Sequence, residues 1–257
     1  MLRLGDSDIR PAHRGEFRVL VAARRTGLGQ VRAYLAADIL RRLSERARLA
    51  PSVFDLRPDH EDQLRAVCGE LNIHPPLQTL NGNDQLGGLF ADGVRDPVFD
   101  VGVCFPVGTN QPTVQRLAGH WIAVPGSAED RDAAASLREL PGLGEEPLAV
   151  RMMLLRHGYG EPLGDGGDRS DQDPAAKTLA RWRELVARWA RTPSGPMSRR
   201  YAETITAAIA GDLDTAAALR ELDALAGDPG EPDGVKFETF AAADMLFGLD
   251  LARDIGR

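Results

Sequence analysis

Short apolar runs and a four-residue repeat alternate along the first part of the chain. Residues 17–23 (FRVLVAA) form an apolar run that predicts a buried strand, and a glycine-containing turn, RRTGLGQ, follows it. Apolar residues then recur every four positions from Val31 to Leu43, which predicts an amphipathic helix over about 30–49. Residues 53–56 predict the next strand. Strand, turn, helix and strand in this order indicate a right-handed parallel crossover.

The hydrophobic pattern is less regular in the middle of the chain and helical in its last part. Residues 81–96 are rich in glycine and lack periodicity, which predicts a surface loop, whereas apolar runs at 98–105 and 120–124 predict two further strands. Residues 148–156 predict a helix. Beyond a Gly- and Asp-rich stretch the pattern is helical throughout, with helices expected over 174–191, 197–210, 214–226 and 237–248.

These elements predict a domain organisation. We expect an α/β domain with a parallel sheet over residues 1–160, a linker over 161–173 and a helical bundle over 174–257. The chain has 257 residues, of which 43% are hydrophobic and 27% charged, so it can form a folded core. Its beginning lacks the apolar segment of a signal peptide, and no stretch approaches the roughly 20 apolar residues of a membrane span. We therefore expect a cytoplasmic protein without a membrane partner.

Charge and cysteine content exclude several kinds of chemistry. The only lysines are Lys177 and Lys236, so a Schiff base or a Walker-type phosphate lysine is excluded from the first 176 residues. GC-rich coding DNA is the simplest origin of this bias. Cys68 and Cys104 lack the paired spacing of a disulfide framework or a zinc knuckle, so we expect both to be small buried residues.

The positive charge gathers at one end of the chain. The net charge is -7, yet residues 1–57 contain 12 arginines and six acids, a balance of +6. One interpretation is an Arg-rich lobe that contacts phosphate, tRNA or a protein partner; the other is a solvated helix face.

Four segments resemble one enzyme family in the order in which that family has them. The turn L-G-Q with the helix over 31–43 resembles the first crossover of class I aminoacyl-tRNA synthetases. The nearest pattern is that of cysteinyl-tRNA synthetase and its relative, the cysteine ligase of mycothiol biosynthesis. Residues 148–163, 201–218 and 240–251 resemble later segments of the same family. The resemblance implies a Rossmann-like nucleotide-binding domain followed by a helical bundle, with the catalytic motifs degenerate and the anticodon-reading portion missing.

The resemblance also implies where a nucleotide would bind. In the family, two histidines of an H-x-G-H turn stabilise charge on the ATP phosphates. Gly27 and Gln30 occupy those positions here, and only Gly29 of the motif remains. We therefore expect nucleotide contacts from Thr26, Gly27, Gly29 and Gln30, although Gln30 carries no charge. The family's lysine-bearing loop corresponds to residues 126–140, which contain no lysine and several acids.

A zinc site is not expected. Cysteine-specific members of the family bind zinc through two cysteines, a histidine and a glutamate. The first cysteine corresponds to Ala22 or Ala23, and the histidine and glutamate correspond to Gly108 and Thr109. The segment that would carry the second cysteine is reduced to the loop at 81–96.

Two further groups of residues have competing interpretations. Asn110, His120 and Trp121 are candidates to line a pocket, although a histidine at a strand end is often structural. Trp182 and Trp189 lie seven residues apart on one predicted helix face, which favours core packing over a stacking surface.

The resemblance and the losses together predict a synthetase paralogue without canonical tRNA charging. We expect it to bind a nucleotide such as ATP or AMP, an aminoacyl group or a partner protein, without a required cofactor and without forming an adenylate. The alternative is a repurposed ligase or transferase that joins an amino acid to a small amine or carrier protein, or takes it from charged tRNA. The sequence assigns no catalytic residue.

Overall fold

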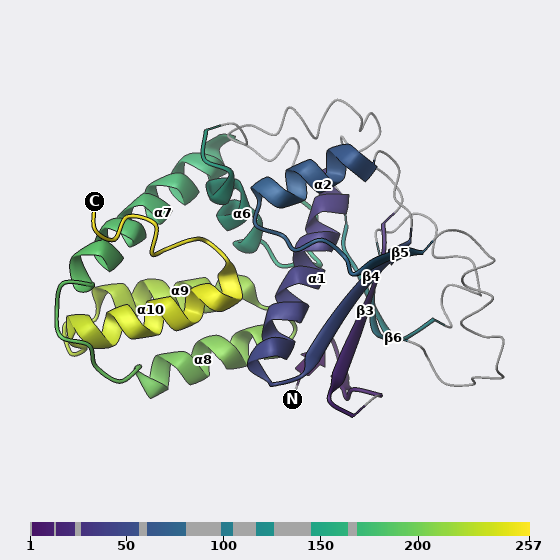
Figure 1. Ribbon diagram of the computed structural model, residues 1–257, viewed down its shortest axis with the longest axis horizontal. Helices are drawn as coiled ribbons and strands as arrows, with labels where there is room; N and C mark the ends of the chain where they lie inside the picture. Colours follow the sequence, from purple (N-terminus) through teal and green to yellow (C-terminus); the bar gives the residue numbers. More distant parts are fainter. Residues whose placement is uncertain are drawn as a thin grey trace. The chain divides into compact units, whose positions relative to one another are not determined.

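The chain folds into two compact units, which are described separately below (Figure 1). Unit 1 comprises residues 1–140 and 159–167, and unit 2 comprises residues 141–158 and 168–257. The computed structural model describes residues 2–12, 14–23, 27–56, 61–80, 99–104, 117–125, 145–163 and 169–257, with the side chains of 169–173 excepted.

Unit 1 is built on a five-stranded parallel sheet with the strand order β5-β4-β3-β6-β7. A small antiparallel hairpin of β1 and β2 precedes it. The elements are β1 (Leu2–Leu4), β2 (Ser7–Ile9), β3 (Glu16–Ala22), α1 (Leu28–Arg46), β4 (Ala50–Leu56), α2 (Glu61–Glu70), β5 (Gln78–Leu80), β6 (Phe99–Cys104) and β7 (Ala118–Ala123). The predicted parallel crossover β3–α1–β4 and the Rossmann-like fold class are confirmed.

The strand order follows from the path of the chain, which adds two strands on one side of β3 and then two on its other side. From β3 the chain moves outward through α1 to β4 and through α2 to β5, and it then returns to pair β6 with the other edge of β3. Figure 1 shows α1 beside β3 and β4; the helix packs on β3, β4, β6 and α2, and 16 of its 19 residues are buried. The reversal of direction between β3 and β6 is the topological switch point, where ligands of open α/β sheets bind.

Some boundaries in unit 1 differ from the prediction. The strand β4 begins at Ala50 rather than at Val53, because its pairing with β3 starts where Glu16 meets Ala50. The hairpin of β1 and β2 and the strand β5 were not predicted, since strands of three residues are too short to show a period. The loop predicted at 81–96 lies outside the described residues.

Unit 2 is helical, as predicted. Its helices are α6 (Pro147–Leu155), α7 (Arg169–Trp189), α8 (Arg199–Ala210), α9 (Thr215–Gly227) and α10 (Asp233–Phe247). Trp182 and Trp189 on α7 are each 1% exposed and lie edge-on to the ring of Phe240, with ring centroids 5.5 and 5.2 Å away. Their predicted role in core packing is confirmed.

The predicted linker is wrong at its end. The helix α7 begins at Arg169, five residues before the predicted start, and it contains Pro174. Proline is disfavoured beyond the first turn of a helix, because it lacks a backbone N–H and its ring crowds the carbonyl four residues earlier, so the pattern gave no reason to expect a helix that begins five residues before Pro174. Residues 141–158, which the prediction put in the first domain, group with unit 2, where α6 packs on α7. No helix in the described part of the chain is long and apolar enough to cross a bilayer.

Candidate nucleotide site at the turn between β3 and α1

The candidate site lies at the carboxyl ends of β3 and β6. Ala22 and Cys104, at the ends of these strands, are register partners across the switch point. The helix α1 begins six residues after Ala22, so its amino end is at this edge of the sheet. A helix of this length directs a partial positive charge and free backbone N–H groups at that edge, which favours a phosphate.

Gly27 gives the turn a backbone conformation that other residues adopt only with strain. Its φ of 134° and ψ of -176° lie in a region that is essentially restricted to glycine. Gln30 and Val31 donate their backbone N–H groups to the Gly27 carbonyl oxygen, at 3.1 and 3.2 Å. No described side chain caps the helix. A histidine at position 27, as in the family, would therefore strain this turn.

Gln30 is buried and fixed. The residue is 1% exposed, and its side-chain Nε2 donates to the Ala23 carbonyl oxygen at 2.8 Å. Its Oε1 atom is buried and has no hydrogen-bond partner among the described residues. Thr26, the other predicted contact, lies outside the described residues. Gln30 thus presents an acceptor and no charge at the amino end of α1.

A buried ionic network lies next to this turn, and the sequence analysis missed it. Tyr34 on α1 donates to Asp55 Oδ2 at 2.5 Å, and Arg65 on α2 donates from Nη2 to the same oxygen at 2.6 Å. Arg65 Nη2 also contacts Thr79 Oγ1 at 3.1 Å and Glu61 Oε1 at 3.5 Å. The Asp55 side chain is 0% exposed. An acid inside the apolar run VFDL was the available signal, because a carboxylate on a buried strand needs partners.

The network changes the proton affinity of its members. Burial, and then the charge of Asp55, raise the pKa of Tyr34 far above its ordinary value, so the phenol remains a donor. Burial lowers the pKa of Arg65, but the hydrogen bond and charge of Asp55 outweigh it and raise that pKa. Both groups therefore keep their protons, and Asp55 accepts from both.

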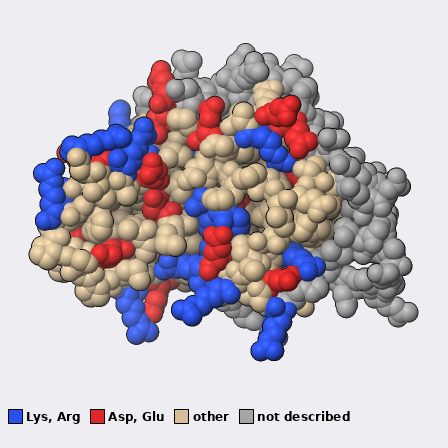
Figure 2. All heavy atoms as spheres, viewed as in Figure 1, with Lys and Arg blue, Asp and Glu red and all other residues tan. Residues whose placement is uncertain are grey.

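Several arginines of the predicted basic lobe serve internal contacts. Arg32 is 3% exposed and donates to the carbonyl oxygens of Pro125 and Glu161, at 2.9 and 2.7 Å. Arg42 donates from Nε to Asp38 Oδ2 at 2.7 Å. On the face drawn in Figure 2, basic and acidic side chains are interspersed over the described residues. The interpretation of this lobe as an Arg-rich contact surface stays a prediction.

The candidate pocket residues on β7 point in different directions. His120 and Trp121 are both half-buried, and as neighbours on one strand they face opposite sides of the sheet. The Trp121 ring lies against Gly102 so closely that a Cβ atom at position 102 would be 2.4 Å from Trp121 Cε3. Trp121 also packs against a core cluster that includes Leu20, Ala22 and Cys104. Asn110 lies outside the described residues.

The predicted zinc positions are apolar where the structure describes them. Ala22 and Ala23 are 8% and 1% exposed, whereas Gly108 and Thr109 lie outside the described residues. Cys68 and Cys104 are free and buried, as predicted, and burial raises the pKa of the Cys104 thiol. The absence of zinc stays a prediction. The loop at 126–140 is likewise not described.

No family model matches the chain, but comparison with curated proteins finds relatives. The chain is similar to the L-cysteine:1D-myo-inositol 2-amino-2-deoxy-α-D-glucopyranoside ligase of Cellulomonas flavigena, at 30% identity over 152 residues, or 55% of this chain and 34% of the relative. The enzyme of the same name from Streptomyces coelicolor is 38% identical over 112 residues, or 42% of this chain and 26% of the relative.

The ligase of that name from Thermobifida fusca matches over a longer stretch. It is 27% identical over 196 residues, or 72% of this chain and 45% of the relative. The chain therefore spans less than half the length of each of these curated relatives. The matches confirm the resemblance stated above: over part of its length the chain is homologous to these cysteine ligases.

Proposed function

We propose that this protein is a cysteinyl-tRNA synthetase-like paralogue that binds a nucleotide or an aminoacyl nucleotide and does not form an adenylate. The observation that carries the proposal is the turn between β3 and α1. There, Gly27 has a glycine-only conformation and Gln30 is a neutral residue tied to the Ala23 carbonyl oxygen.

The turn supports binding of a phosphate. The helix α1 has 19 residues, its amino end carries no side-chain cap among the described residues, and it starts at the switch point of the sheet. Backbone N–H groups at such a helix end bind phosphate without help from a lysine. ATP and AMP are therefore the first ligands to test, and no further cofactor, zinc included, is part of the proposal.

The same turn argues against adenylate formation. Charge develops on the phosphates in the transition state, and catalysis requires fixed donors or cations aimed at that charge. The Gln30 donor is already used by Ala23, and its remaining Oε1 atom is an acceptor, which repels a phosphate oxygen. The turn can therefore hold a ground-state phosphate better than it can stabilise a reacting one.

The test combines binding with turnover. Calorimetric titration with ATP, AMP and an aminoacyl-sulfamoyl adenosine is expected to show binding that Gly27→Val weakens, because the substitution strains the turn. Met245→Ala on α10 is the matched control, since Met245 is 71% exposed in unit 2. Amino-acid-dependent pyrophosphate exchange above the level of a Gln30→Ala variant would refute the proposal.

The comparisons favour a second candidate function. The relatives are ligases by name, which motivates a repurposed ligase or transferase that uses an amino acid or a charged tRNA. Binding of charged tRNA that weakens steeply with salt would support the tRNA version, because phosphate contacts release counterions. Salt-independent binding, or no binding, would count against it.

A further inference from the structure

The segment that joins α7 to α8 is basic, although the chain as a whole is acidic. Between Glu184 and Glu203 the sequence contains four arginines and neither an acid nor a lysine, whereas the net charge of the chain is -7. The four, all exposed, are Arg188, Arg191, Arg199 and Arg200. The side chains of Arg188 and Arg191 have no ion-pair partner among the described residues. This end of unit 2 therefore carries positive charge that the fold does not use.

Two of these arginines are unfavourable for the helix that they begin. Arg199 and Arg200 are the first two residues of α8, where the helix dipole disfavours positive charge. The first turn contains no acid, and Ser198, at the N-cap position, donates its hydroxyl to Glu231 Oε1 at 2.6 Å instead of capping the helix. The ion pair of Arg199 with Glu203 joins side chains that are 89% and 64% exposed, so it contributes little. Local choices that oppose the fold are typical of functional surfaces.

The loop between α7 and α8 is fixed to α10. Ser194 Oγ donates to Glu238 Oε1 at 2.6 Å, and the Ser198 backbone N–H donates to Thr239 Oγ1 at 2.9 Å. The loop sequence, TPSGPMS, also contains two prolines, which restrict its backbone. A backbone that is already ordered presents its side chains to a partner without the entropic cost of ordering a loop on binding.

This loop presents an apolar side chain beside the arginines. Met197 is 47% exposed and directly precedes the start of α8. Methionine and arginine are enriched at protein interfaces, in which a polar rim surrounds an apolar centre. A nucleic acid fits this surface less well, because Glu231 and Glu238 contact the loop and would repel a continuous run of phosphates. Separate carboxylates on a protein segment can avoid these two acids.

We propose that Arg191, Met197, Arg199 and Arg200 form a docking surface for an acidic segment of a partner protein. Carboxylates of the segment pair with the arginines, and an apolar side chain of the segment packs on Met197. The proposal goes beyond nucleotide binding and is independent of it, because all four residues belong to unit 2, whereas the turn proposed to bind a nucleotide belongs to unit 1.

The test measures binding of a fluorescently labelled helical peptide, with glutamates on one face and leucines on the other, to the full chain by fluorescence anisotropy. Arg199→Glu/Arg200→Glu is expected to weaken binding at least about 10-fold. Acids in the first turn favour α8, so this variant is expected to fold. Met197→Ser is expected to weaken binding about 3- to 10-fold, because it removes the apolar contact.

The matched control is Lys177→Glu/Arg220→Glu, which changes the net charge by the same amount at exposed positions of α7 and α9. It is expected to retain binding within about twofold. No binding of the peptide by the wild type, or equal weakening in the control, would overturn the proposal. Unchanged binding in Met197→Ser would remove the apolar contact from it. Polyuridylate is titrated in parallel, and tighter binding of this RNA than of the peptide, lost in Arg199→Glu/Arg200→Glu, would assign the surface to nucleic acid instead.

Discussion

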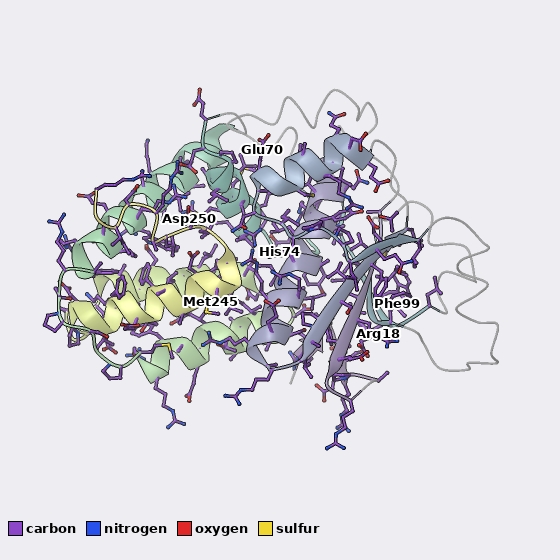
Figure 3. The ribbon with its side chains drawn as sticks, viewed as in Figure 1. Arg18, Glu70, His74, Phe99, Met245 and Asp250 are labelled. Carbon is purple, nitrogen blue, oxygen red and sulfur yellow. The ribbon has the colours of Figure 1, made fainter. Side chains whose placement is uncertain are left out.

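The two units use buried charged residues in different ways. In unit 2, Arg151 and Arg183 are 0% and 4% exposed and donate to main-chain carbonyl oxygens at and beyond the end of α10, among them those of Phe247 and Leu249. Arg183 also reaches Asp250, which Figure 3 labels, and forms an ion pair with Glu146 at 3.0 Å. The carbonyls at a helix end need partners, and these arginines supply them.

In unit 1, by contrast, charged side chains are among the buried groups left partly unpaired, whereas the corresponding atom among the described residues of unit 2 is the neutral Trp189 Nε1. Gln30, Asp55 and Arg65 each keep one buried atom without a partner in the described part of the chain. An unpaired buried polar atom costs about 1–3 kcal/mol, and a bound water, ion or ligand that supplies a partner offsets this cost. The comparison therefore distinguishes charge that closes a helix end from charge that keeps an open hydrogen-bonding position.

The largest expected effect comes from removing the central acid of unit 1. Asp55→Ala leaves Arg65 without its main partner in a buried site and is expected to lower the free energy of unfolding by about 3 kcal/mol. Urea unfolding of the purified protein measures the change. A loss below about 1 kcal/mol would mean that the network contributes little to the fold, and the contrast between the units would fail.

The matching change in unit 2 replaces an arginine that closes a helix end. Arg151→Met keeps an unbranched apolar stem but removes the hydrogen bond to the Phe247 carbonyl oxygen, so we expect a loss of about 2 kcal/mol in urea unfolding. AMP affinity per folded molecule is expected to stay the same. A change in that affinity would show that the buried charges of unit 2 also serve the ligand site.

Most of the architecture could be predicted from the sequence, and most of the polar site could not. The crossover from β3 to β4 was predictable, because an apolar run, a glycine turn and a four-residue repeat each report local structure. The pairing of Tyr34, Asp55 and Arg65 joins three elements, and no local period reports which side chains meet. The exchange of the family's first histidine for Gly27 was visible in the sequence. Its structural consequence, a φ of 134° at Gly27, could be seen only in the backbone conformation of the folded chain.

A smaller loss of stability is expected from a change at Gly102, whose backbone lies against the Trp121 ring in the sheet of unit 1. Gly102→Ala places a Cβ atom 2.4 Å from the Trp121 ring, which must move, and we expect a loss of about 1–2 kcal/mol. Thermal unfolding followed by tryptophan fluorescence measures it. Gly69→Ala on α2 is the matched control, because nothing lies within 4 Å of its added Cβ and helix propensity favours alanine. Equal effects of the two substitutions would contradict the close packing.

The smallest effect concerns a half-exposed histidine whose partners, Asp38 and Arg41, lie in the carboxyl-terminal half of α1. His74, labelled beside α1 in Figure 3, accepts from Arg41 Nη2 at Nδ1 over 2.8 Å, and its backbone N–H donates to Asp38. Burial, and then the charge of Arg41, lower the pKa of His74 below its usual 6.5. Arg42 adds to the lowering and Asp38 opposes it.

This shift gives the stability of unit 1 a small dependence on pH. Because the unfolded chain binds the proton more readily, the stability is complete above about pH 6.5 and falls as the pH drops through that value towards the lower pKa of the folded state. The midpoint of thermal unfolding is therefore expected to fall less between pH 7.5 and 5.5 in His74→Gln than in the wild type. His157→Gln, in unit 2, controls for the loss of a histidine. The same slope in wild type and His74→Gln would show that burial and the contact with Arg41 do not bias the protonation of His74.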